Sequence, residues 1–221
     1  MNVLVIGASR GIGLELVRQY LDAGERVIAT ARDDAALERL RAMGAVPLTL
    51  DVANPASISG LAWLLDGEKI DIAIYVAGVM SRGDALTPPT QPDFDLVMHT
   101  NVLGAMQAIP QVAPLVEAAQ GRLAFISSDM GRMTGVPSSY SWTYRVSKAA
   151  LNMAVASARH SYPQAILVAL SPGWVQTDMG GSGAPLSVLS SVAAMRDTLA
   201  RLTPADSGRF FDIDGQPMVG W

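Results

Sequence analysis

The chain has 221 residues, of which 50% are hydrophobic and 16% are charged, and its formal net charge is −4. These values exclude a disordered chain, and they give no reason to expect nucleic acid or an anionic membrane as a partner. The sequence contains no cysteine and only two histidines, which excludes disulfides, thiolate metal sites, a cysteine nucleophile and a multi-histidine metal site.

The length and hydropathy indicate one domain that spans residues 1–221 and buries a sizeable core. No apolar run reaches the roughly 18 residues that a membrane-spanning helix requires. The first residues lack the basic start and the long apolar stretch of a signal peptide, so the expected location is cytoplasmic.

The chain begins with a strand, a glycine-rich turn and a helix. Asn2–Ile6 is almost wholly apolar and rich in β-branched residues, which is typical of a strand buried on both faces. Gly7, Gly11 and Gly13 follow, and apolar residues then recur at helical spacing. A helix N-terminus offers unpaired N–H groups, and glycine lets a diphosphate approach them. The G-x-x-x-G-x-G spacing differs from the common G-x-G-x-x-G fingerprint, so a turn that serves only packing is the alternative.

Strands and helices alternate along the rest of the chain, which predicts an α/β fold with a doubly wound parallel sheet and helices on both faces. Further helices are predicted at about 34–43, 55–65, 93–119, 140–161 and 186–202, and further strands at 26–30, 46–50, 70–76, 122–127, 165–170 and 209–211. Asp33 or Asp34 can cap the first of these helices, and Asn54 can cap the next. Pro110 and Pro114 are expected to kink or divide the stretch 93–119.

A second group of residues carries chemistry. Tyr144 and Lys148 are four residues apart in a predicted helix and therefore share one face. Ser127 and Ser128 end the fifth predicted strand, at the edge where open α/β sheets bind ligands. An ammonium beside a phenol lowers the phenol's pKa towards the range of a general acid, and a serine hydroxyl can hold a substrate oxygen. Alone, this spacing also fits a surface tyrosine beside a solvated lysine.

Taken together and in this order, these pieces resemble the classical short-chain dehydrogenase/reductase family over nearly the whole chain. The matching pieces are Gly-Ala-Ser-Arg-Gly-Ile-Gly at 7–13, Asp51-Val52, Ala77-Gly78, Asn101-Val102, Ile-Ser-Ser at 126–128, Tyr144 with Lys148, and Ser-Pro-Gly-Trp-Val-Gln-Thr at 171–177. The resemblance implies a Rossmann-like fold. The short length, the run at 144–152 and the Phe-Phe-Asp-Ile-Asp-Gly ending are similar to the small C-factor-like branch.

The resemblance also implies a role for each matching residue. Tyr144 would be the catalytic acid/base, and Lys148 would lower its pKa and hold the nicotinamide ribose. Ser128 would orient the substrate carbonyl, and Asn101 would support a proton-relay water. Tyr140 lacks a lysine four residues later and is not a candidate. The implied cofactor-binding residues are Gly7, Ser9, Arg10, Gly11, Ile12, Gly13, Arg32, Asp51, Val52, Ala77, Gly78, Tyr144, Lys148, Pro172, Gly173, Val175 and Thr177.

Three features depart from the family pattern. Ile6 stands where a threonine usually precedes the first glycine, and Tyr75-Val76 replaces two asparagines. Those polar side chains normally tie neighbouring strand ends together, so their loss bears on cofactor affinity. The interval between Ser128 and Tyr144 is longer than usual, which enlarges the loop over the substrate.

The end of the second strand predicts NADP(H) as the cofactor, in preference to NAD(H). An acidic side chain there favours a 2′-hydroxyl, whereas an arginine favours a 2′-phosphate. Ala31 is small, and Arg32 and Arg10 can hold one phosphate from both sides. In the alternative interpretation Asp33 binds the ribose and both arginines are solvated.

Two classes of function fit this sequence. The first is an oxidoreductase, most simply a carbonyl reductase, that moves hydride between a nicotinamide and a carbonyl or alcohol. The second is a signalling or regulatory nucleotide-binding protein with little turnover. Apolar residues on both faces of the helices at 93–119 and 140–161 suggest a homodimer or homotetramer. An apolar substrate wall, or alternatively core packing, accounts for Met130, Met133, Trp142, Trp174 and Met179.

Overall fold

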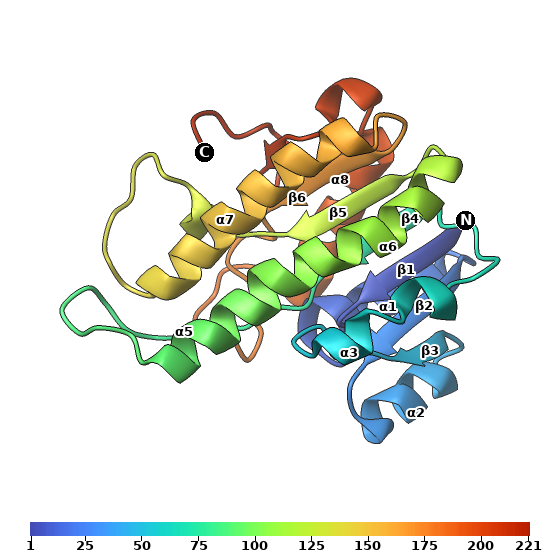
Figure 1. Cartoon of the computed structure of the whole chain (residues 1–221), viewed down its shortest axis with the longest axis horizontal. Helices are drawn as coiled ribbons and strands as arrows, with labels where there is room; N and C mark the ends of the chain where they lie inside the picture. Colours follow the sequence, from blue (N-terminus) through green and yellow to red (C-terminus); the bar gives the residue numbers. More distant parts are fainter.

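A computed structural model describes residues 1–221, and one seven-stranded sheet runs through it (Figure 1). All the strand pairs are parallel, in the order β3-β2-β1-β4-β5-β6-β7. The order reverses between β1 and β4, so the two neighbouring strands send the chain to opposite sides of the sheet. The strands are β1 Asn2–Ile6, β2 Arg26–Ala31, β3 Val46–Thr49, β4 Ile72–Tyr75, β5 Arg122–Ile126, β6 Ile166–Leu170 and β7 Phe210–Phe211.

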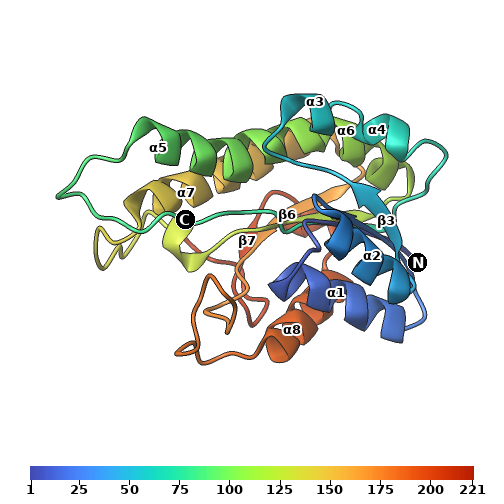
Figure 2. The same cartoon turned by 90° about the horizontal axis from the view of Figure 1, so that it is seen from below.

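Helices cover both faces of this sheet. Figure 2 shows α1, α2 and α8 on one face and α3 to α7 on the other. The helices are α1 Gly11–Asp22, α2 Asp34–Ala42, α3 Pro55–Ile58, α4 Leu61–Leu64, α5 Gln91–Met98, α6 Gly104–Ala118, α7 Trp142–Ala158 and α8 Val188–Arg201. Short 3₁₀ helices occupy Asp129–Gly131, Arg159–Ser161 and Pro204–Asp206. This arrangement confirms the predicted doubly wound α/β fold. None of the helices combines the length and the apolar character needed to cross a bilayer.

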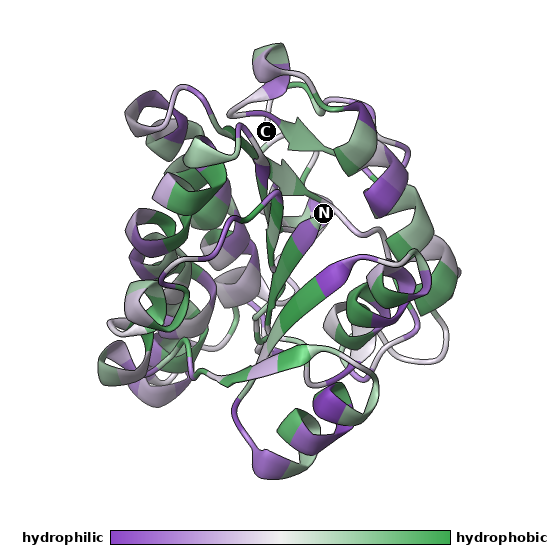
Figure 3. Ribbon diagram, turned by 90° about the vertical axis from the view of Figure 1, so that its right-hand side faces the viewer, coloured by the Kyte–Doolittle hydropathy of each residue, from purple (hydrophilic) through white to green (hydrophobic).

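The two faces of the sheet carry apolar cores of nearly equal size, with 25 and 23 buried residues. The strands are therefore apolar on both sides, and Figure 3 shows them as a hydrophobic centre between the two helical layers. This double burial explains why the strands appear in the sequence as continuous apolar runs without alternation.

The stretch 93–119 divides at a different place from the one predicted. A π-helical turn, His99–Leu103, separates α5 from α6, while Pro110 and Pro114 both lie inside α6. Both prolines lie on the exposed side of α6. The prolines were expected to kink or divide this stretch; the division is wrong, and a kink stays a prediction.

Tertiary contacts hold the π-helical turn. The Tyr75 hydroxyl on β4 donates to the Thr100 carbonyl at 2.9 Å. A Cβ at Gly104 would lie 2.7 Å from the same hydroxyl, so the glycine allows this close approach. The partner lies 25 residues away in the chain, which is why local sequence patterns do not reveal the turn.

Two of the predicted helix caps are present. The Asp33 carboxylate accepts from the Ala36 N–H at 2.9 Å, and Asn54 accepts from the Ala56 N–H at 3.0 Å. The helix that follows Asn54 was predicted to be continuous over 55–65. Instead it consists of α3 and α4, with Ser59 and Gly60 between them, because glycine weakens a helix interior.

Candidate active site

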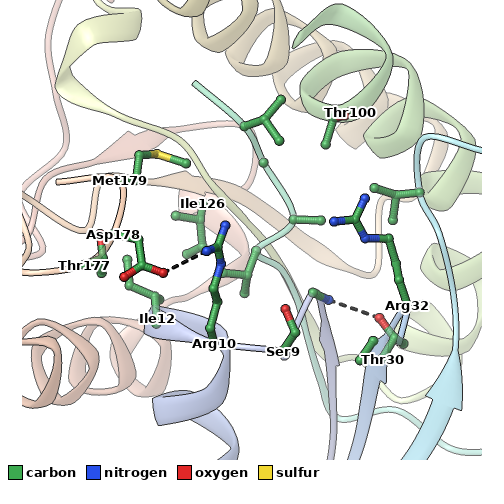
Figure 4. A pocket seen from close by; sticks show the side chains of 18 of the residues that line it. Ser9, Arg10, Ile12, Thr30, Arg32, Thr100, Ile126, Thr177, Asp178 and Met179 are labelled. Atoms are coloured by element: carbon green, nitrogen blue, oxygen red, sulfur yellow. Dashed lines mark hydrogen bonds and ion pairs between the residues drawn. The ribbon is translucent and has the colours of Figure 1, made fainter. Parts of the chain in front are cut away.

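A cavity of about 240 Å³ opens at the carboxyl ends of the strands, where the strand order reverses. Its walls come from the turn after β1, the end of β2, the segments after β3 and β4, α7 and the loop after β6 (Figure 4). Open α/β sheets bind ligands in such crevices. The predicted residues that line it are Gly7, Ser9, Arg10, Gly11, Ile12, Arg32, Asp51, Val52, Ala77, Gly78, Tyr144, Lys148, Pro172 and Thr177.

Three predicted cofactor residues lie behind this lining and support it. A Cβ at Gly13 would collide with the Gly7 carbonyl, so this glycine serves the close packing of turn and helix. Gly173 has a φ of +72°, a conformation that favours glycine. Val175 is buried and forms a β-bridge with Leu186 across the loop after β6. The structure therefore gives these residues a part in shaping the walls, and they do not form the surface of the cavity.

The glycine turn presents an open helix N-terminus to the cavity. Arg10 is the N-cap residue of α1, and no side chain caps the helix or places a carboxylate in its first turn. Gly7 has a φ of +92°, and a Cβ there would lie 2.7 Å from the Ala77 nitrogen. The uncapped N–H groups and the positive end of the helix dipole fit a diphosphate.

The Thr30 side chain joins the end of β2 to the glycine turn after β1, and this contact was not predicted from the sequence. The Gly7 N–H donates to the Thr30 hydroxyl at 3.0 Å, so β2 holds the start of the glycine turn. Ile6, in place of the threonine usual in the family, implied the loss of a side chain that normally ties neighbouring strand ends together. A strand threonine next to β1 gives no local signal of this role, because the contact depends on the sheet register that places Ile6 opposite Thr30.

Tyr144 and Lys148 lie side by side on α7 and are almost fully buried, with 6% and 3% of their surface exposed. The Lys148 ammonium is 5.5 Å from the centre of the Tyr144 ring and donates to the Ile126 carbonyl at 2.8 Å. Ser128 is the second residue after β5, and its hydroxyl accepts from the Met130 N–H. Tyr144 and Lys148 line one end of the cavity, whereas Ser128 does not line it but lies within hydrogen-bonding reach of Tyr144.

Burial controls the protonation of this pair. It raises the pKa of Tyr144 to about 12, and a hydrogen bond from Ser128 opposes the shift. Burial also lowers the pKa of Lys148 to about 8. We expected the ammonium to lower the pKa of Tyr144, but the structure has the opposite direction, because burial disfavours the phenolate. Tyr144 is therefore a protonated phenol at neutral pH.

A third residue of α7 joins this arrangement. Asn152 is four residues beyond Lys148 and accepts from the Ser127 hydroxyl at 2.6 Å. Side chains at three successive turns of one helix face thus contact the three consecutive residues Ile126, Ser127 and Ser128. Ser127 is bound to Asn152 and lines the cavity, whereas Ser128 is partly exposed and does not line it. The role of Ser128 towards the substrate stays a prediction.

Asn101 lies in the π-helical turn and is completely buried. Its amide accepts from the Val79 N–H at 2.8 Å, and it donates to the Val79 carbonyl at 2.8 Å and to the Ser147 hydroxyl at 2.9 Å. The side chain therefore fastens the segment after β4 to α7. A Cβ at Gly78 would lie 3.3 Å from the Asn101 amide oxygen and 3.5 Å from the Lys148 ammonium, so the glycine lies between the two. The proton-relay role of Asn101 remains a prediction.

Arginines surround the end of the cavity near β2. Arg32 lines it and forms no ion pair, whereas Arg10 pairs with Asp178 at 2.7 Å. Arg39 of α2 was not predicted here, and it donates to the Ser9 carbonyl at 2.6 Å. The Asp33 carboxylate caps α2 by accepting from the Ala36 N–H. This role weighs against the alternative interpretation, in which Asp33 binds the ribose. Figure 4 shows Arg10 turned towards Asp178 and Arg32 on the other side of the cavity.

The loop after β6 contributes residues that the sequence analysis left out or left open. Asp178 and Met179 line the cavity next to the predicted Thr177, and their position in the chain was the one signal that could have found them. Met133, Trp174 and Met179 are 69%, 60% and 40% exposed, so core packing does not explain them. They remain candidates for an apolar substrate wall.

Comparisons with known proteins agree with this geometry. A family model described as short chain dehydrogenase matches residues 1–185. The chain is 33% identical to 1-hydroxy-2-glutathionyl-2-methyl-3-butene dehydrogenase of Rhodococcus sp. (strain AD45), over 97% of both chains. It is 39% identical to C-signal of Myxococcus xanthus, over 66% of this chain and 90% of that one. The solved structure of an NADPH-bound carbonyl reductase from chicken fatty liver has a TM-score of 0.90 and 30% identity, and the match covers 100% of this chain and 98% of that one.

Proposed function

The chain belongs to the short-chain dehydrogenase/reductase family, and from this we propose that it is an NADP(H)-dependent oxidoreductase acting on a small carbonyl or alcohol substrate. The observation that carries the proposal is the shape of one cavity. An uncapped helix N-terminus and an unpaired arginine lie towards one end, and a buried tyrosine–lysine pair lies at the other.

The residues of the cavity fit the cofactor. The N–H groups at the start of α1 would hold the diphosphate, and Arg32 beside the small Ala31 would hold the 2′-phosphate of the adenosine. Asp51, Val52, Ala77 and Gly78 would line the adenosine, and Pro172 and Thr177 the nicotinamide end. The NADPH-bound carbonyl reductase with the same fold supports this choice of cofactor. Bound NADPH supplies hydride to a carbonyl carbon.

The remaining chemistry belongs to the side chains of α7 and β5. Ser128 would donate a hydrogen bond to the substrate carbonyl oxygen and hold it beside Tyr144. As hydride reaches the carbon, the Tyr144 hydroxyl would give its proton to the oxygen, which becomes the alcohol. The raised pKa of Tyr144 keeps this proton in place at neutral pH, which suits the direction of reduction. Lys148 would hold the nicotinamide ribose and lie next to the phenolate that forms.

A second function is a signalling or regulatory role with little turnover, and the 39% identity to C-signal favours it. A protein that only binds a nucleotide needs the glycine turn and the arginines. It does not need Tyr144 and Lys148 at one end of the cavity with Ser128 hydrogen-bonded to Tyr144, so we favour the enzyme.

The test is a substrate screen that follows the absorbance of the reduced nicotinamide. Aldehydes, ketones and quinones are offered with NADPH and with NADH, and a glutathionyl alcohol is offered with NADP⁺ because of the Rhodococcus relative. We expect turnover of at least one carbonyl class, faster with NADPH than with NADH. Tight NADPH binding without any turnover would support the signalling role, and turnover with NADH alone would contradict the proposed cofactor.

A further inference from the structure

The loop after β6 lies against the glycine turn at the mouth of the cavity. A Cβ at Gly11 would lie 3.5 Å from the Thr177 methyl carbon, and the next residue, Asp178, pairs with Arg10 at 2.7 Å. Figure 4 shows the two side chains directed towards each other, with the ion pair drawn as a dashed line. The Asp178 carboxylate therefore forms an ion pair with Arg10, one of the two arginines that the sequence predicts to bind the cofactor 2′-phosphate.

This ion pair is the one polar link between the loop and the glycine turn. The other hydrogen bonds of residues 174–187 stay inside the loop or join it to α8. Within the loop, Trp174 donates to the Gly180 carbonyl at 2.8 Å, and the Gly180 N–H donates to the Thr177 hydroxyl at 3.0 Å. The loop thus has its own internal structure and is fastened to the glycine turn through Asp178.

We propose that Asp178 competes with the cofactor 2′-phosphate for Arg10, so that NADP(H) releases the loop from the glycine turn and NAD(H) does not. The inference rests on the proposed use of NADP(H). A phosphate carries more negative charge than a carboxylate and accepts the same paired hydrogen bonds from a guanidinium. The ribose hydroxyl of NAD(H) carries no charge and cannot displace Asp178.

The exposure of the pair makes this exchange feasible. The side chains of Arg10 and Asp178 are 76% and 75% exposed, and ion pairs in such positions are weak. A dianion that is also held by Arg32 can therefore replace the carboxylate, which then swings out with its loop. Since Met179 and the exposed Trp174 belong to this loop, the identity of the cofactor would also set the position of the substrate wall.

A double-mutant cycle on cofactor affinity tests the competition. Asp178→Asn is expected to tighten NADPH binding by about two- to fivefold, the range for an exposed ion pair, and to leave NADH binding unchanged. In an Arg10→Gln background the same substitution should have no effect on NADPH. Asp66→Asn removes an equal charge from an exposed site outside the cavity and should change neither affinity.

Three outcomes would overturn the inference. An equal gain for NADPH and NADH, or the same gain with Arg10→Gln present, would show general charge repulsion instead of competition. No gain with Asp178→Asn, in a wild type that prefers NADPH, would show that the pair does not resist the phosphate. A wild type that binds NADPH and NADH equally would instead contradict the proposed cofactor, so the two failures are distinguishable.

Amide hydrogen exchange of residues 174–187 reports on the loop itself. Adenosine 2′,5′-bisphosphate and 5′-AMP occupy only the adenosine end of the cavity, and they differ by the phosphate in question. We expect the bisphosphate to speed exchange in this loop and 5′-AMP to leave it unchanged, while Asp178→Asn shows the faster exchange without any nucleotide. Equal exchange in the wild type with both saturating nucleotides would overturn the release of the loop.

Discussion

Single residues decide the chemistry of this site through their burial. Tyr144 and Lys148 are both enclosed by α7 and the end of β5, and the loss of water favours the neutral form of each. Tyr144 therefore keeps its proton at neutral pH, and an amine whose pKa is near 8 changes charge close to physiological pH. Both properties follow from the same packing.

Replacement of Tyr144 by phenylalanine tests the proton donor. Tyr144→Phe keeps the ring volume, so the fold and NADPH binding should survive, while turnover should fall by about 10²- to 10⁴-fold. Tyr140→Phe is the matched control, because Tyr140 is nearby and 48% exposed, and it should keep the wild-type rate. Steady-state rates on an identified carbonyl measure both variants. A Tyr144→Phe enzyme that is as fast as the wild type would show that another group donates the proton.

The lowered pKa of Lys148 predicts a specific dependence of stability on pH. The unfolded chain keeps this proton up to about pH 10.5, whereas the folded chain loses it near pH 8. Between these pH values the unfolded state binds more protons than the folded state. The contribution of Lys148 to the free energy of unfolding therefore rises with pH. Relative to Lys148→Met, the wild type should gain about 2–3 kcal/mol between about pH 7 and pH 10.5. Urea denaturation at several pH values measures the difference, and a constant or falling difference would show that the pKa is not lowered.

Arg32 predicts cofactor preference at the level of one side chain. A hydrogen bond to a charged group is worth roughly 1.5–3 kcal/mol, so Arg32→Ala should weaken NADPH binding by about ten- to a hundredfold. NADH binding should be nearly unchanged. Arg41→Ala, on α2 and paired with Glu38, is the control and should alter neither affinity. Fluorescence titration of both cofactors measures the effect, and parallel losses for NADPH and NADH would rule out a phosphate contact.

At the scale of elements, the strands and the face of α7 that carries Tyr144 and Lys148 follow from local patterns. Apolar runs and the spacing of Tyr144 and Lys148 depend on neighbours in the chain, so the sequence alone predicts them. Asn152 extends the same face but was missed, because its partner Ser127 lies on β5 and an asparagine there has no signature of its own. The π-helical turn was missed for the same kind of reason, since Tyr75 of β4 holds it.

The prolines of α6 predict that this helix is less stable than it could be. Pro114 is exposed and in the helix interior, where it removes one intrahelical hydrogen bond. Pro114→Ala should restore that bond and raise the free energy of unfolding by about 1–2 kcal/mol, after the greater freedom of the unfolded chain is subtracted. Thermal unfolding checks this expectation. A lower melting temperature would indicate that the proline contributes packing that outweighs the missing bond.

At the scale of the whole molecule, the alternation of strands and helices predicts the fold. It does not predict the contact between the glycine turn and the loop after β6. Arg10 and Asp178 are 168 residues apart in the chain, and only the strand order brings their segments together. The glycine turn and the loop after β6 could each be predicted as cofactor segments from their motifs. Their contact, and the engagement of Arg10 with a carboxylate, could not.

Exposed apolar side chains on the helical layer that contains α5, α6 and α7 predict that the protein associates with itself. Large apolar side chains remain exposed on α5, α6 and α7, namely Phe94, Leu96, Met106, Val146 and Met153. We propose that these helices form a homodimer or homotetramer contact, since such groups lose unfavourable hydration on burial. Light scattering should give a multiple of 23.3 kDa, and Met106→Glu with Met153→Glu should lower the mass. A single 23.3 kDa species at micromolar concentration would contradict the proposal.

The most direct test of the proposed reaction follows the hydride itself. NADPH that carries deuterium at both C4 positions of the nicotinamide is incubated with the protein and a carbonyl substrate, and the product alcohol is examined by mass spectrometry and NMR. We expect one deuterium on the former carbonyl carbon with the wild type, and at least a hundredfold slower labelling with Tyr144→Phe. Two results would contradict the assignment of this cavity as a hydride-transfer site. One is a product alcohol without deuterium at that carbon, and the other is that NADPH binds but none of the carbonyl compounds tested is reduced.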